Sequence, residues 1–336
     1  MKVLVTGNLG YVGSILFKML KQENFQVDGL DIGYFPQNIV NNNHTTQKKS
    51  DVRNVIEEDL VGYDAICHLA ALSNDPLGEI NSDLTFEVNH KSTINLAKMA
   101  KNAGVKRFIF SSSCSSYGSN QDIVDEKCEL LPLTAYAKSK VLAENDLLQL
   151  HDQNFIPVNL RSATAYGLST NLRLDLVANN LTGSAVATGL VKLLSDGSAW
   201  RPLVHVDDMA NAFITTLKSS EQKIAGQTFN VGGNEDNYTV REIADTVESI
   251  VPNSKIVYAQ NANKDFRSYK VSFDKIQNEL GFKPKRKLYE GIMEMYKKFL
   301  ELKITEKEFL DKKFYRLKYI NWLIEQKIIN SELKII

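Results

Sequence analysis

A glycine-spaced turn near the N-terminus constrains the fold of this chain more than any other feature. Residues 2–5 form an apolar run typical of a buried strand, and residues 14–20 repeat apolar positions at helical spacing. Between them, Gly7 permits a tight turn, Gly10 lets the backbone approach a phosphate oxygen, and Gly13 lets the helix lie close to the strand. Because a helix start offers unpaired N–H groups and a positive dipole end, the turn predicts a pyrophosphate site. An ordinary glycine-containing turn is the alternative.

A carboxylate follows this turn at the distance expected for a ribose-binding residue. A second apolar run, residues 26–31, ends at Asp31, roughly 20 residues after the glycines. Asp31 can accept hydrogen bonds from both hydroxyls of an adenosine ribose, but its charge would repel a 2′-phosphate. Residues 32–34 hold no arginine that would neutralise such a phosphate. The sequence therefore favours NAD over NADP as the cofactor.

Strand and helix patterns alternate through the first half of the chain. The predicted strands cover residues 3–6, 27–31, 63–71, 107–112 and 156–161, and later 204–206 and 228–231. This alternation predicts a Rossmann-type α/β fold, a doubly wound parallel sheet with helices on both faces. We expect an NAD-binding domain of residues 1–165 plus about 204–230 and a smaller α/β substrate-binding lobe of residues 166–203 plus about 231–300. Residues 301–336 would form a C-terminal helical extension.

Composition and charge narrow the partners. Forty basic and forty acidic residues leave no net charge, so the overall electrostatics indicate neither nucleic acid nor an anionic membrane as the main partner. No apolar run reaches about 18 residues and a core strand begins at Lys2, so we expect a cytoplasmic protein without a signal peptide. Three dispersed cysteines, Cys67, Cys114 and Cys128, are too few for a disulfide framework, and no His/Asp/Glu cluster suggests a metal.

The tail, residues 314–336, carries apolar residues at helical spacing. We expect it to pack on its own domain, and a subunit interface is the alternative.

A tyrosine and a lysine form the candidate reacting pair. Tyr136 and Lys140 lie in a segment that leads into a helical run. Because four helical residues turn the chain by about 400°, the two side chains share a face. A phenol is a poor base at neutral pH, and a nearby ammonium group would lower its pKa. The serine-rich residues 111–118 end a predicted central strand at the same sheet edge, where a hydroxyl can orient a substrate oxygen. Taken alone, either pattern could be structural.

Five motifs together resemble a known family. These are residues 6–13, 68–71, 111–118, Tyr136-x-x-x-Lys140 and 201–208. The chain is similar to the extended short-chain dehydrogenases/reductases from residue 1 to about residue 300. Within that family it most resembles the NAD-dependent nucleotide-sugar epimerase/dehydratases of the UDP-glucose 4-epimerase type.

The resemblance implies roles for individual residues. Tyr136 would be the acid/base, Ser113 its partner, and Lys140 the residue that lowers the pKa of the tyrosine and holds the nicotinamide ribose. Cofactor contacts would come from Gly7, Asn8, Leu9, Gly10, Tyr11, Val12, Gly13, Asp31, Asp51, Val52, Leu69, Ala70, Ala71, Ser111, Tyr136 and Lys140, with Asp51 and Val52 flanking the adenine. Substrate contacts would come from Ser73, Ser115, Asn179, Arg201 and Arg267.

Asn179, Arg201 and Arg267 would bind the substrate's diphosphate. A loop cap for Asn179 and surface ion pairs for the two arginines are the alternatives. His68 is expected to be a satisfied strand histidine rather than a catalyst.

Departures from the family pattern bear on the reaction. Sugar 4,6-dehydratases carry an Asp-Glu pair directly after the catalytic Thr, where this chain has Cys114-Ser115, which disfavours a dehydratase and a glutamate-assisted decarboxylase. The 4-keto reductases usually prefer NADPH, against which Asp31 argues. What remains is oxidation at C4 of a nucleotide sugar, by a 4-epimerase in the first place or by a hexose or heptose 4-dehydrogenase. Residues 71–76 and 265–269 resemble a branch of bacterial surface-sugar enzymes for which both outcomes are open.

A non-catalytic dinucleotide-sensing regulator is the remote alternative, disfavoured because the tyrosine and the lysine are both present. The resemblance also implies a homodimer formed through the helix that carries Tyr136 and the helix at residues 92–103.

Overall fold

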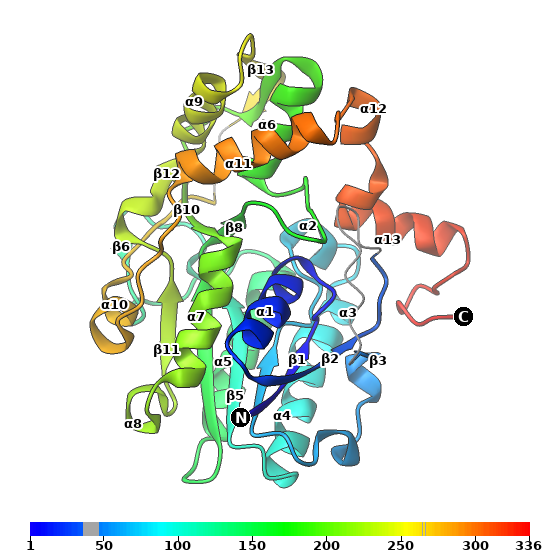
Figure 1. Cartoon of the computed structure of the whole chain (residues 1–336), viewed down its shortest axis with the longest axis vertical. Coiled ribbons are helices and arrows are strands. Elements are labelled where there is room, and N and C mark those ends of the chain that lie inside the picture. The colour runs from blue at the N-terminus through cyan, green and yellow to red at the C-terminus, as the bar shows by residue number, and fades with distance from the viewer. Residues whose placement is uncertain (36–46, 264, 266) are drawn as a thin grey trace.

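The main sheet organises the molecule. The computed structural model describes residues 1–35, 47–263, 265 and 267–336 (Figure 1). Within these residues the sheet has seven strands in the order β11-β7-β5-β4-β1-β2-β3, and every neighbouring pair is parallel. In chain order the strands are β1 (Lys2–Thr6), β2 (Gln26–Asp31), β3 (Gln47–Lys49), β4 (Ala65–His68), β5 (Arg107–Ser113), β7 (Ile156–Ser162) and β11 (Thr228–Val231).

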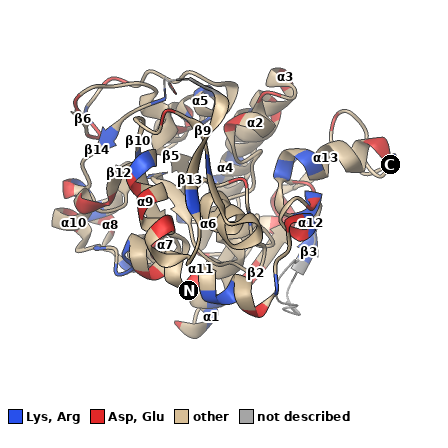
Figure 2. Ribbon diagram, turned by 90° about the horizontal axis from the view of Figure 1, so that it is seen from above, with Lys and Arg blue, Asp and Glu red and all other residues tan. Residues whose placement is uncertain are grey.

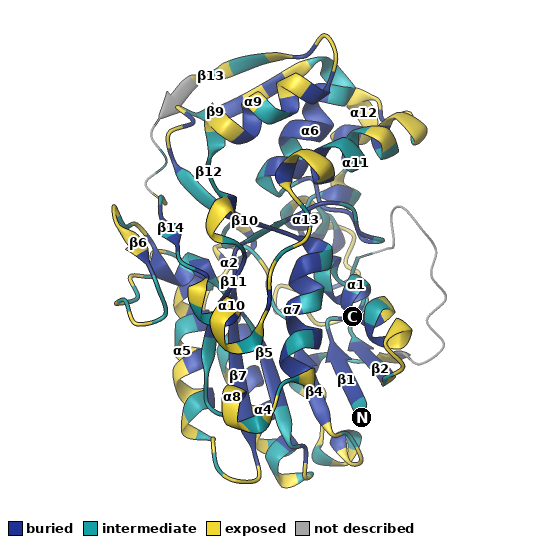
Figure 3. Cartoon of the chain, turned by 60° about the vertical axis from the view of Figure 1, so that its left-hand side comes forward, coloured by how far each residue is buried: buried dark blue, intermediate teal, exposed yellow. Residues whose placement is uncertain are grey.

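Helices cover both faces of this sheet. Val3 and Val5 of β1 face one hydrophobic cluster, which includes residues of α1 (Tyr11–Gln22) and α7 (Val206–Lys218). Leu4 faces the opposite cluster, which includes residues of α4 (Ser92–Asn102) and α5 (Ala135–Gln149). Figure 3 shows the sheet strands as mostly buried and the outer sides of the helices as exposed. The doubly wound Rossmann-type fold predicted from the alternation is therefore confirmed.

A second group of elements lies above the carboxyl ends of the sheet in Figure 1. Its own hydrophobic cluster is separate from the two that flank the main sheet. The strands are β8 (Thr164–Tyr166), β9 (Leu190–Ser195), β10 (Trp200–His205), β12 (Asn237–Thr239) and β13 (Lys255–Asn263). The helices are α6 (Val177–Thr188), α9 (Val240–Ile250), α11 (Leu288–Glu301) and α12 (Glu306–Phe309).

The two later predicted strands, residues 204–206 and 228–231, belong to different sheets in the structure. β11 joins the main sheet beside β7, whereas β10 pairs with β8 and β12 in a sheet of the second group. Val206 does not belong to the strand, because it begins α7.

Short elements complete the chain. Their bounds are β6 (Ile123–Val124), β14 (Lys270–Val271), α2 (Asp75–Gly78), α3 (Ser82–Phe86), α8 (Glu221–Ile224) and α10 (Asp274–Leu280). Helix α13 (Arg316–Glu325) and the residues after it pack on α2, α3 and neighbouring loops through a fourth hydrophobic cluster. The apolar residues of the tail thus pack against other elements of the same chain.

Charged residues of both signs are spread over the described part of the chain (Figure 2). In Figure 2, residues of both signs occur around the whole outline of the ribbon. Among the helices that the structure describes, none has the length and apolar character needed to cross a bilayer.

Candidate active site

A cavity of about 920 Å³ lies where the carboxyl ends of β1, β2, β4 and β5 meet the second group of elements. Of the residues predicted to react or to bind cofactor or substrate, all line this cavity except Asn8, Leu9, Lys140 and Asn179. The fold therefore gathers residues that lie up to 260 positions apart, Gly7 and Arg267 among them, around one space.

The glycine turn fits a phosphate group. Gly7 has φ +74°, a left-handed conformation that favours glycine, and a Cβ on Gly13 would lie 2.0 Å from the Gly7 carbonyl oxygen. Helix α1 starts after Gly10 with no side-chain cap, so the first N–H groups of the helix remain available to an anion. Asn8 is buried, and its amide packs where a side chain on Gly29 would lie. Asn8 thus supports the turn rather than lining the cavity.

Asp31, at the end of β2, is tied to the same turn. One carboxylate oxygen accepts a hydrogen bond from Gly33 N at 2.8 Å, and the other accepts one from Leu9 N at 3.1 Å. Burial raises the pKa of Asp31, and these two N–H groups together with the charge of Arg316 lower it. Leu9 contributes through its backbone, which aligns the turn with the predicted ribose-binding carboxylate.

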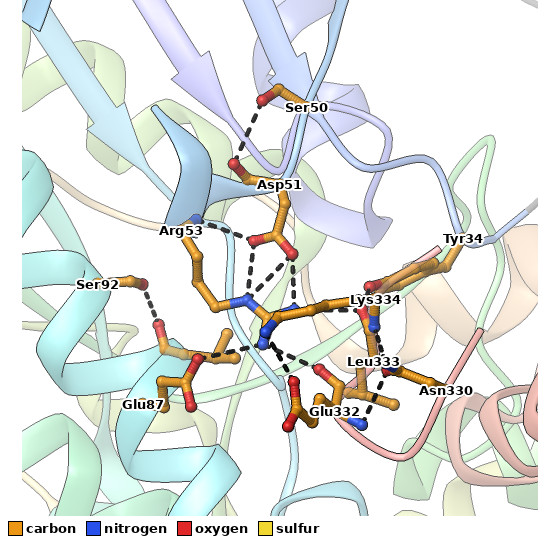
Figure 4. A network of polar contacts seen from close by, with 11 residues as sticks. Tyr34, Ser50, Asp51, Arg53, Glu87, Ser92, Asn330, Glu332, Leu333 and Lys334 are labelled. Carbon is orange, nitrogen blue, oxygen red and sulfur yellow. Dashed lines mark hydrogen bonds and ion pairs between the residues drawn. The ribbon is translucent and has the colours of Figure 1, made fainter. Parts of the chain in front are cut away.

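Asp51 and Val52 line the cavity beyond Asp31. The Asp51 carboxylate accepts hydrogen bonds from the backbone N–H of Arg53 at 2.9 Å and from its guanidinium, with the closest contact 2.6 Å (Figure 4). The predicted adenine-flanking position therefore carries a carboxylate that is held in place by an ion pair.

Tyr136 lies in the first turn of α5, whose N-cap Thr134 accepts a hydrogen bond from Ala137 N at 3.1 Å. Burial, with a further contribution from Asp75, raises the pKa of Tyr136 to about 12, while a hydrogen bond with Ser113 lowers it. The Ser113 hydroxyl in turn accepts hydrogen bonds from the N–H of Ser115 at 3.1 Å and its hydroxyl at 2.9 Å. The structure thus brings the tyrosine and its predicted serine partner together.

Lys140 lies one turn after Tyr136 on α5. Its ammonium donates to the Ser111 carbonyl oxygen at 2.8 Å and lies 5.8 Å from the centre of the Tyr136 ring. Burial lowers the pKa of Lys140 to about 7, although Glu144 raises it. In the ligand-free chain burial raises the pKa of Tyr136, and the groups that lower it are Ser113 and Arg173; the predicted role of Lys140 toward Tyr136 stays a prediction for the chain with NAD bound.

The two predicted diphosphate arginines converge on one carboxylate. Arg201 contacts Asp265 at 2.6 Å, and Arg267 contacts the same carboxylate at 3.0 Å and Asp75 at 3.2 Å. The Arg201 guanidinium also donates to the Arg267 carbonyl oxygen. Since both guanidiniums line the cavity, they can exchange these carboxylates for phosphate oxygens.

Asn179 does not reach the cavity. Its side-chain oxygen accepts from Gly167 N at 2.9 Å, and its amide nitrogen donates to Arg173 O at 2.9 Å and to Tyr11. The prediction of Asn179 as a diphosphate ligand is not supported, because these bonds occupy the buried side chain. Asn180, the next residue, lines the cavity and was missed.

Two further lining residues were also missed. Arg173 is buried, pairs with Asp175 at 2.8 Å and contacts Ser73 at 3.3 Å. Arg316 comes from α13. No local motif marks either arginine in the sequence.

Two residues outside the cavity bear on the chemistry. Cys114 is fully buried, and its thiol donates to Arg161 O at 3.1 Å, so the position after Ser113 presents no acid to the cavity. His68 is buried between the hydroxyls of Thr6 at 2.7 Å and Thr93 at 2.9 Å, and burial lowers its pKa to about 3. The prediction of a satisfied strand histidine is confirmed.

Comparison with known proteins identifies the family of this chain. Among curated proteins, the chain is 26% identical over 332 residues to UDP-glucuronic acid decarboxylase 6 of Arabidopsis thaliana, with 91% of each chain covered. It is 28% identical over 265 residues to the uncharacterized UDP-glucose epimerase YtcB of Bacillus subtilis (strain 168), covering 74% of this chain and 82% of the relative.

A solved structure, UDP-glucuronic acid 4-epimerase from Bacillus cereus in complex with UDP-glucuronic acid and NAD, matches with a TM-score of 0.78 and 24% identity. The match covers 90% of this chain and 100% of that one, and at this identity it shows the shared fold.

The model of the NAD dependent epimerase/dehydratase family matches residues 3–232, which confirms the resemblance seen in the motifs. The chain belongs to the NAD dependent epimerase/dehydratase family, and its cofactor is NAD.

Proposed function

We propose that this protein oxidises C4 of a nucleotide-activated sugar and acts as a nucleotide-sugar 4-epimerase. The observation that carries the proposal is the pairing of Tyr136 with Ser113 in the cavity that the glycine turn also lines. The buried thiol of Cys114, where 4,6-dehydratases carry a carboxylate, argues against elimination of water.

The residues of the chain divide the work. Tyr136 would take the proton of the sugar hydroxyl, and Ser113 would hold that hydroxyl in line with the phenol oxygen. NAD, when bound, supplies the acceptor for the hydrogen and electron pair that leave the sugar carbon, and its positive ring favours the phenolate. In an epimerase, Tyr136 would return the proton to the sugar oxygen when the keto sugar, turned to its other face, takes back at C4 the hydrogen and electron pair held by the reduced cofactor.

The nucleotide diphosphate would be held by two arginines that line the cavity. Arg201 and Arg267 offer planar donor pairs that suit phosphate oxygens, and Asp265 and Asp75 hold them there in the ligand-free chain. This exchange of carboxylate for phosphate would couple substrate binding to the loop that carries Asp265. We also propose that residues 166–203 and about 231–300 act as the substrate-binding lobe.

Two other outcomes begin with the same oxidation. A 4-dehydrogenase would release the keto sugar and leave NADH. The curated relatives named UDP-glucuronic acid decarboxylases add a third outcome, because a 4-keto uronic acid is a β-keto acid and can lose its carboxyl group. The remaining alternatives, a 4-keto reductase and a dinucleotide sensor, would show no oxidation of a nucleotide sugar.

The test combines product analysis with Tyr136→Phe. Purified protein is incubated with a panel of UDP-, GDP- and CDP-sugars, including uronic acids, and products are identified by NMR and mass spectrometry. We expect a sugar inverted at C4, lost in Tyr136→Phe with NAD affinity retained. Tyr63→Phe is the matched control, since its hydroxyl bonds Asp28 at 2.8 Å and the residue lies outside the cavity lining.

Each other result reverses the proposal in a different way. Accumulation of NADH without an inverted sugar would establish the dehydrogenase, and release of CO₂ the decarboxylase. Full activity in Tyr136→Phe would refute the assignment of the base.

We further propose the homodimer through α4 and α5. These helices pack together on one face of the sheet, and Leu142 of α5 is 42% exposed. Light scattering should give twice the mass of the 37.8 kDa chain, and Leu142→Glu should give the monomer. A monomeric wild-type protein would exclude this arrangement.

A further inference from the structure

Arg316 is an unexpected cation in the wall of the cavity. It begins α13, is only 3% exposed, and lines the cavity together with Ile320 and Leu333 of the same C-terminal extension. It comes from a part of the chain that the motif comparison does not cover.

The structure holds this guanidinium beside the glycine turn. Its Nη2 donates to the side-chain oxygen of Asn171 at 2.9 Å, and the Asn171 amide donates to the Leu9 carbonyl at 2.8 Å. The ring of Phe35 lies 3.9 Å from the guanidinium carbon, and the Arg316 backbone N–H donates to Asp175 at 3.3 Å. Two hydrogen bonds through Asn171 therefore connect Arg316 to Leu9 of the glycine turn.

The other guanidinium nitrogen, Nη1, is buried and has no hydrogen-bond partner within the described residues. The nearby carboxylates are occupied, since Asp31 accepts two backbone N–H groups and Asp175 pairs with Arg173. Burial and the neighbouring Arg173 lower the pKa of Arg316 to about 9. A buried cation with an unused donor is costly unless an anion pairs with it.

We propose that Arg316 donates to the pyrophosphate of NAD, so that the C-terminal extension forms part of the cofactor site. A guanidinium needs an anion, and the pyrophosphate is the anionic part of the cofactor that the glycine turn attracts. The adenosine ribose carries no charge, and Asp31 is already placed for it. This inference rests on the cofactor and does not depend on which sugar reacts.

Residues 332 and 333 of the C-terminal extension are held by hydrogen bonds near Asp51. Arg53 donates to the carbonyl oxygens of Glu332 at 2.9 Å and Leu333 at 3.2 Å, and Tyr34 donates to the same Leu333 carbonyl (Figure 4). Because Arg53 is itself paired with Asp51, the extension is fastened to the predicted adenine-flanking residues. Together with the hydrogen bond from the Arg316 N–H to Asp175, these contacts hold the extension at residue 316 and at residues 332–333.

The test separates phosphate binding from a structural role. The full-length chain, freed of bound nucleotide, is titrated with NAD and ADP-ribose by calorimetry and with adenosine by ligand-observed NMR. Arg316→Gln should weaken NAD and ADP-ribose by about 10- to 100-fold, as expected for loss of a charge-assisted hydrogen bond, and change adenosine binding by less than about twofold. Lys318→Gln, which removes an exposed charge from the same helix, should change none of the three.

Two results would overturn the proposal. Unchanged affinity for ADP-ribose would show that Arg316 does not contact the phosphates, and an equal loss for adenosine would show that it only holds α13 in place.

If Arg316→Gln does not fold, Arg316→Lys carries the test, because one ammonium cannot bond Asn171 and a phosphate with the geometry of a guanidinium. We then expect ADP-ribose binding at least about threefold weaker with adenosine unchanged, and wild-type affinity for ADP-ribose would contradict the proposal.

Discussion

Replacing Glu144 by Gln should destabilise the protein strongly, because it breaks a buried ion pair behind the candidate active site. Glu144 lies on α5 one turn after Lys140, and its side chain is 1% exposed. The Arg161 guanidinium contacts it at 2.6 Å and is itself only 7% exposed. The Ser112 hydroxyl also donates to the carboxylate. A neutral amide would leave Arg161 buried without its counter-charge.

The expected cost is about 3–5 kcal/mol in the free energy of unfolding. It should appear in urea denaturation and as a fall in melting temperature of roughly 4–7 °C. Combining Glu144→Gln with Arg161→Met should recover part of the loss, since no unpaired charge then remains. Glu235→Gln, in the exposed pair with Lys287, is the control and should leave stability nearly unchanged. A loss below about 1 kcal/mol for Glu144→Gln would refute the reasoning.

Two other substitutions test the site. The pKa of Lys140 is about 7 in the folded chain, whereas an exposed lysine, as in the unfolded chain, has a pKa of 10.5. Between these two pH values the unfolded chain binds one more proton than the folded chain, so the free energy of unfolding rises with pH by about 1.4 kcal/mol per pH unit. Lys140→Met should remove that slope in urea denaturation from pH 7.5 to 9.5, and parallel profiles would contradict the assignment. Gly13→Ala places a Cβ 2.0 Å from the Gly7 oxygen, so calorimetry should show NAD binding lost; normal binding would mean that the turn is not the phosphate site.

The sequence predicted what depends on neighbouring residues. The turn at Gly7, the carboxylate Asp31 and the helix with Tyr136 are local patterns whose chemistry and spacing are set within a few residues. Asn180 lines the cavity and Asn179 does not, because one residue turns a helix by about 100°, and the sequence alone does not tell which of the two faces the cavity. Burial, which no motif reports, raises the pKa of Tyr136 in the ligand-free chain.

Cavity residues from remote segments were not predicted for another reason. Arg173 and Arg316 enter the cavity only through tertiary packing, and an isolated arginine in a loop or helix start has no pattern that separates it from a surface charge. The domain boundaries, the site roles and the dimer stay predictions.

The attachment of residues 316–333 to Tyr34, Arg53 and the cavity has a consequence during synthesis. The glycine turn leaves the ribosome about 300 residues before Arg316, which at 5–20 residues per second is a delay of roughly 15 to 60 seconds. The sheet can assemble during that interval, but the wall of the cavity is completed only when the extension arrives. A nascent chain would therefore meet NAD with an open pocket, and tight retention of the cofactor should begin only after residues 316–333 have been synthesised.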